Sequence, residues 1–108
     1  METRIRGDLI ALDKKVRGEI ERLRDDLLGR YESSMQEVVV ELGEEQQPGF
    51  PTSYNCAITV TTRQGDRVST RSRERVVLNA LRRGFETVAL EVKRAMRRRT
   101  VATPELAA

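Results

Sequence analysis

Histidine and tryptophan are absent from this chain of 108 residues, and cysteine occurs once, as Cys56. Without histidine the chain lacks the commonest proton shuttle near neutral pH and the commonest metal ligand. A single cysteine has no partner for an intramolecular disulfide, and Cys56 lies in an alternating apolar run that is typical of a buried strand. We therefore expect a binding protein, with no enzymatic activity, no metal and no cofactor.

Long apolar runs and glycine-rich loops are also missing. No segment approaches the roughly 20 consecutive apolar residues of a membrane span, and residues 1–7 lack the apolar core of a secretory signal. The seven glycines are scattered, and none has the spacing of a phosphate-binding loop. These absences predict a cytoplasmic protein that binds neither a membrane nor a small-molecule substrate.

Arginine, by contrast, is abundant and unevenly distributed. It supplies 17 of the 20 basic residues. Residues 1–62 hold 8 basic and 12 acidic side chains, net −4, while residues 63–108 hold 12 basic and 5 acidic ones, net +7. Such an asymmetry in a short chain predicts that the second half binds a polyanion. RNA fits this requirement, because a guanidinium group forks onto phosphate and stacks on unpaired bases.

Two helices are predicted from apolar residues at helical spacing. The first spans Lys14–Tyr31, with Asp13 placed to cap its N-terminus. The second runs from about Glu74 to Arg99 and should bury one stripe of residues: Leu78, Leu81, Phe85, Val88, Val92 and Met96. Its opposite side then carries seven candidate RNA-binding cations: Arg75, Arg82, Arg83, Lys93, Arg94, Arg97 and Arg98. A solvated helix face without a ligand is the alternative interpretation.

The remaining pattern predicts an α+β fold in a single domain of β-α-β-β-β-α order. Strands are expected at residues 2–6, 36–42, 54–62 and 67–71, with a turn at 63–66 and a long loop at 43–53. Both helices should pack on one face of a four-stranded, mostly antiparallel sheet, leaving the other face in water. This domain covers residues 1–99, and residues 100–108 are expected to be a disordered tail.

Four basic residues outside the last helix are further candidates. Arg67 and Arg71 follow one face of the last strand, where they either extend the basic surface or protect a sheet edge from aggregation. Arg17 and Arg22 lie on the first helix among several acidic residues, a pattern that is typical of an ordinary surface with weak ion pairs.

The order of the elements and several runs of residues resemble the ribosome hibernation promoting factors and ribosome-associated inhibitors. The resemblance extends over roughly residues 4–99 and is that of a short family member. It rests on Ile5-Arg6-Gly7, the cap Asp13 with Val16-Arg17, the valine strand at residues 38–40, the hairpin at 57–68 and the helical segment at 80–86.

This resemblance implies a bacterial stress-response protein that sits on the small ribosomal subunit, between head and body. Basic side chains on its helices, with Arg17 and Arg22 among them, would hold the ribosomal RNA, block the path of messenger and transfer RNA, and promote ribosome hibernation. Two other functions stay open: a general module for structured RNA, and a regulator that uses the open sheet face or residues 44–53 to bind a protein partner. A weak homodimer through an open strand edge also stays open.

Overall fold

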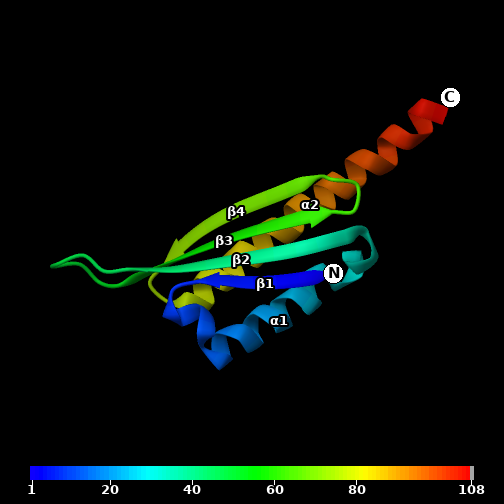
Figure 1. Ribbon diagram of the computed structural model, residues 1–108. Coiled ribbons are helices and arrows are strands. Elements are labelled where there is room, and N and C mark those ends of the chain that lie inside the picture. The colour runs from blue at the N-terminus through cyan, green and yellow to red at the C-terminus, as the bar shows by residue number, and fades with distance from the viewer. Residues whose placement is uncertain (108) are drawn as a thin grey trace.

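The computed structural model describes the backbone of residues 1–107 and the side chains of residues 1–98. One sheet has the strand order β1-β2-β3-β4, with β1 parallel to β2 and the other neighbours antiparallel. Both α-helices cover the same face of this sheet (Figure 1). The elements are β1 (Glu2–Gly7), α1 (Lys14–Leu28), β2 (Met35–Glu45), β3 (Ser53–Thr62), β4 (Arg67–Glu74) and α2 (Val77–Ala107). The predicted α+β architecture is confirmed.

Helix α1 begins where the sequence predicts. The Asp13 carboxylate accepts hydrogen bonds from the backbone N–H groups of Lys15 and Val16, at 2.8 and 3.1 Å, and so satisfies two donors of the first turn. The helix ends at Leu28, one turn earlier than expected, because residues 29–34 tighten into a 3-10 helix that leads into β2. Its buried residues are Val16, Ile20, Leu23 and Leu28.

The hairpin between β2 and β3 is longer than predicted. Residues 43–53 were expected to be loop, but β2 continues to Glu45, which pairs with Ser53 of β3. The break is confined to the tip, where the Phe50 N–H donates to the Gln47 carbonyl at 3.0 Å and Gly49 has a φ of +81°. A Pro-Gly pair turns the chain tightly there, so the neighbouring residues stay free to pair. The hairpin therefore projects beyond the rest of the sheet as an arm (Figure 1).

The junction between β4 and α2 also differs from the prediction. Strand β4 keeps pairing with β3 as far as Glu74, so α2 begins at Val77 and Arg75 lies in the connection, before the helix. At the other end the backbone of α2 continues through Ala107. The prediction of a disordered tail at residues 100–108 stays a prediction.

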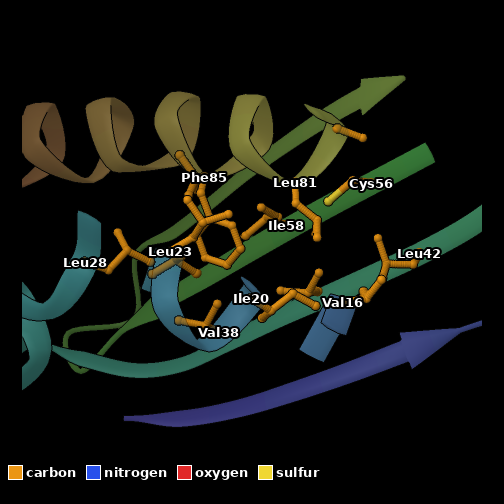
Figure 2. Close-up of a cluster of buried hydrophobic side chains, with 14 of the residues drawn as sticks. Val16, Ile20, Leu23, Leu28, Val38, Leu42, Cys56, Ile58, Leu81 and Phe85 are labelled. Carbon is orange, nitrogen blue, oxygen red and sulfur yellow. The ribbon is translucent and has the colours of Figure 1, made fainter. Parts of the chain in front are cut away.

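The core lies between the helices and the covered face of the sheet. Figure 2 shows Phe85 pointing from α2 toward Leu23 of α1 and Ile58 of β3. The predicted stripe of α2 is confirmed from Leu81 onward. Leu78 is an exception, since it is 38% exposed. It occupies the first turn, at the same angle around the helix as the half-buried Met96, while the buried arc is displaced toward Ala80 and Gly84.

Glycine 84 allows the backbone of α2 to come close to the sheet. The hydroxyl of Ser72 donates to the Ala80 carbonyl at 2.7 Å, and that of Thr70 donates to the Gly84 carbonyl at 3.3 Å. A Cβ atom at Gly84 would lie 2.9 Å from Cδ1 of Ile58 and 3.4 Å from the Ser72 hydroxyl. The missing side chain thus sets the spacing between α2 and the β3–β4 pair.

Replacement of Gly84 by leucine is expected to lower the free energy of unfolding by about 1 to 3 kcal/mol, because the added atoms overpack a filled core. Urea denaturation measures this loss. Gly18→Leu is the matched control, since Gly18 is also helical and a Cβ atom added there would have nothing within 4 Å. It should gain about 0.5 to 1 kcal/mol from helix propensity. Equal effects at both positions would mean that α2 has room to move away from the sheet.

Candidate nucleic-acid interface

The outward side of α2 forms a basic face, which the exposed Glu86 and Leu90 interrupt midway. Its side chains are exposed, as predicted: Arg82, Arg83, Lys93, Arg94, Arg97 and Arg98. Two of them pair with carboxylates, Arg83 with Glu74 at 2.7 Å and Arg94 with Glu91 at 2.8 Å. Exposed pairs of this kind contribute little free energy and exchange partners readily. The face can therefore offer all six cations to a polyanion.

The two candidates on α1 are less available. Arg17 is half-buried, and its Nε donates to the Ala11 carbonyl at 2.8 Å. Arg22 pairs with Asp26 at 3.0 Å and also with Glu19. A hydrogen bond from the Arg22 guanidinium to Glu19, together with the nearby positive charge of Arg82 on α2, holds the pKa of the Glu19 carboxyl below its ordinary value. Helix α1 therefore brings acidic charge to the edge of the basic face.

Strand β4 joins the basic face to the edge of the sheet. A shallow groove of about 490 Å³ lies between β4 and α2, and it is lined by Arg67 and Arg71 of the strand and Arg98 of the helix. Ser69, Thr70, Thr87 and the carboxylate of Glu91 line the same groove, and the hydroxyl groups of Thr70 and Thr87 donate to the backbone carbonyls of Gly84 and Arg83. The structure thus brings two strand candidates and a helix candidate together.

Arg75 lies apart from the other candidates. It lines a second hollow, of about 370 Å³, at the base of the hairpin arm, together with Phe50 and Pro51. The Phe50 side chain is 71% exposed, so the arm carries a bare aromatic ring near its tip. Sequence reasoning missed this residue, although the Pro48-Gly49 turn that presents it was visible as a loop signal.

Cys56 lies under α2, away from the basic face, and is 1% exposed, as its place in an alternating run predicts. Burial raises the pKa of the thiol to about 12, although a hydrogen bond with Ser72 acts in the opposite direction. The reactive thiolate is therefore suppressed in the native state.

We expect iodoacetamide to label Cys56 at pH 8 only after urea unfolds the chain, with mass spectrometry as the readout. Because the pKa of Cys56 is raised in the native state, the neutral thiol contributes to the free energy of unfolding. This contribution is fully present below the ordinary pKa of 9.0 and is lost as the pH rises toward 12. Native labelling at the unfolded rate would contradict the burial of this thiol.

The cations of the basic face are guanidinium and ammonium groups, which donate hydrogen bonds to phosphate oxygens. Among the described residues no three histidine, cysteine, aspartate or glutamate side chains are grouped so as to hold a metal ion. In the same part of the chain, no helix has both the length and the apolar character for crossing a membrane.

No protein-family model matches the chain, and no curated protein matches its sequence. Solved structures share its fold. The N-terminal domain of Protein Y from Thermus thermophilus matches with a TM-score of 0.70 and 20% identity, over 87% of this chain and 98% of that one. A ribosomal subunit interface protein from Coxiella burnetii matches with a TM-score of 0.71 and 8% identity, over 89% and 98%. Both matches are at low sequence identity and concern the fold, and the predicted α+β arrangement of the domain is confirmed.

Proposed function

We propose that this chain is a ribosome-associated translation regulator that binds the ribosomal RNA of the small subunit. In that position it would block the path of messenger and transfer RNA and promote ribosome hibernation in the bacterial cytoplasm under stress. The observation that carries this proposal is a fold shared, over 89% of the chain, with a protein named as a ribosomal subunit interface protein. The basic face of α2 supplies the contact chemistry.

The dimensions of the basic face suit an RNA backbone. From Arg82 to Arg98 the helix rises about 24 Å. Its cations form two groups, at residues 82–83 and 93–98, so they can contact phosphates at two separate places along a backbone. The groove beside β4 extends this row around the sheet edge with Arg67 and Arg71. Each cation that neutralises a phosphate releases a counterion, so binding should weaken steeply as salt is raised.

Sedimentation tests the proposal. Purified protein is mixed with isolated small subunits or whole ribosomes at low and moderate salt, with a structured non-ribosomal RNA as competitor. Saturable binding near one copy per subunit that survives the competitor is the expected result. Binding that the competitor removes would instead indicate a general module for structured RNA.

The hairpin arm favours one alternative function. Its exposed Phe50 lines a hollow together with Glu45 and Pro51, and an exposed aromatic ring at a hollow is typical of the residues that anchor protein–protein interfaces. A regulator that acts through a protein partner would bind with little dependence on salt. Absence of ribosome sedimentation at both salt concentrations would favour this function.

A further inference from the structure

The open face of the sheet, opposite the helices, carries two charged rows of opposite sign on β2 and β4, and β1 adds Glu2, Arg4 and Arg6 beyond the β2 row. Strand β2 contributes the acidic row, Glu37, Glu41 and Glu45, and strand β4 contributes the basic row, Arg67, Arg71 and Arg73. Strand β3 lies between them and presents uncharged side chains on this face: Asn55, Ala57, Thr59 and Thr61. The face is therefore acidic and basic in parallel stripes.

The strand register places the two rows level with each other. Glu41 and Arg71 are both paired with Ala57. In the same way, Glu37 and Arg67 are both paired with Thr61. Glu37 and Glu41 thus lie directly across β3 from Arg67 and Arg71.

The two rows are too far apart to neutralise each other along most of their length. They are separated by two strand spacings, about 10 Å. Arg73 and Glu45 do pair, at 2.8 Å, at the base of the hairpin, and Glu37 pairs with Arg4 of β1 at 3.2 Å. Within the part of the chain that the structure describes, Glu41 and Arg71 are exposed and make no ion pair.

We propose that the open sheet face binds a second copy of this chain, face to face, about a twofold axis that runs along β3. Rotation about that axis exchanges the positions of β2 and β4 and preserves the height of each residue along the strands. Arg71 of one copy then faces Glu41 of the other, and Arg67 faces Glu37. Each contact occurs twice, as an isologous interface requires.

The centre of this interface is small and uncharged. Ala57 and Thr59 of the two copies would meet on the axis, which allows the sheets to approach to the roughly 10 Å of packed sheets. The helices point outward in both copies, so the basic face of α2 stays open. Arg67 and Arg71, however, would be covered by the partner and withdrawn from RNA.

Sedimentation equilibrium of the protein alone tests this interface, independently of any ribosome binding. The variants are Glu41→Arg and Arg71→Glu, each of which sets like charges against each other twice in a dimer. Each should weaken self-association at least about tenfold. An equal mixture of the two should associate again, because a dimer with one copy of each has opposite charges at both contacts.

Control variants change charge by the same amount on the helix side. Glu86→Arg and Lys93→Glu alter exposed residues of α2 and should leave self-association unchanged. Because a polar interface is weak, the measurement extends to about 1 mM protein at low salt. Three outcomes would overturn the proposal. The protein could be monomeric at every concentration, self-association could survive both charge reversals, or an equal mixture of the two variants could fail to associate.

Discussion

Reversal of Arg82, Arg83, Arg94 and Arg97 to glutamate is expected to weaken ribosome binding at least about a hundredfold. The four side chains lie on the outward face of α2, where a carboxylate in place of a guanidinium turns attraction for phosphate into repulsion. All four are exposed, so the fold should be retained. Sedimentation with small subunits measures the loss, and far-ultraviolet circular dichroism verifies the fold.

A matched variant separates position from net charge. Arg6, Lys14, Lys15 and Arg30 are four exposed cations outside the proposed surface, and their reversal changes the net charge by the same amount. This control should retain most of the binding, apart from a general weakening by long-range repulsion. Full ribosome binding by the α2 variant, or equal losses in both, would refute the assignment of the site.

Truncation of Phe85 to alanine is expected to lower the free energy of unfolding by about 3 to 5 kcal/mol. Phe85 is fully buried and fills the space between α2, α1 and the sheet (Figure 2). Its removal loses apolar burial and leaves a cavity that the surrounding side chains fill incompletely. Urea denaturation gives the value, and in a domain of this size the loss is a large part of the total stability.

Leu90→Ala is the companion variant, because Leu90 lies on the same helix but is 47% exposed. It should cost less than about 1 kcal/mol, since surface truncations have small effects. Truncation of a buried aromatic side chain costs about 3 to 5 kcal/mol. A loss below about 1 kcal/mol for Phe85→Ala would therefore mean that α2 turns a different face toward the sheet.

Local signals in the sequence were sufficient for most of the fold. The cap at Asp13, the alternation in β3 and the stripe from Leu81 to Met96 each depend on neighbours a few residues apart, and all three are found in the structure. The ends of elements were harder to predict. Whether β2 stops at Leu42 or continues to Glu45 is decided by pairing with Ser53 across the hairpin, which no local pattern encodes.

The candidate site was predicted in part for the same reason. Exposure of the α2 cations follows from helical spacing, so it could be deduced from the sequence. The pairs of Arg22 with Glu19 and Asp26 lie within α1 at i,i+3 and i,i+4 spacing, and they agree with the weak ion pairs that the sequence pattern indicates. The placement of Arg98, Arg67 and Arg71 along one groove depends instead on how α2 crosses β4. Tertiary contacts of this kind have no sequence signature. The binding role of every candidate stays a prediction.

One side of helix α2 packs in the core, and the other side carries the basic face. Binding of a ligand to that face is therefore coupled to folding of the chain. Whatever polyanion binds the cations of α2 binds the native chain in preference to the unfolded one, so bound chains must resist unfolding more strongly than free ones. At a free ligand concentration a hundred times the dissociation constant, this linkage amounts to about 2.7 kcal/mol. The protein would therefore be longest lived while it is occupied, and its turnover would follow the supply of its target.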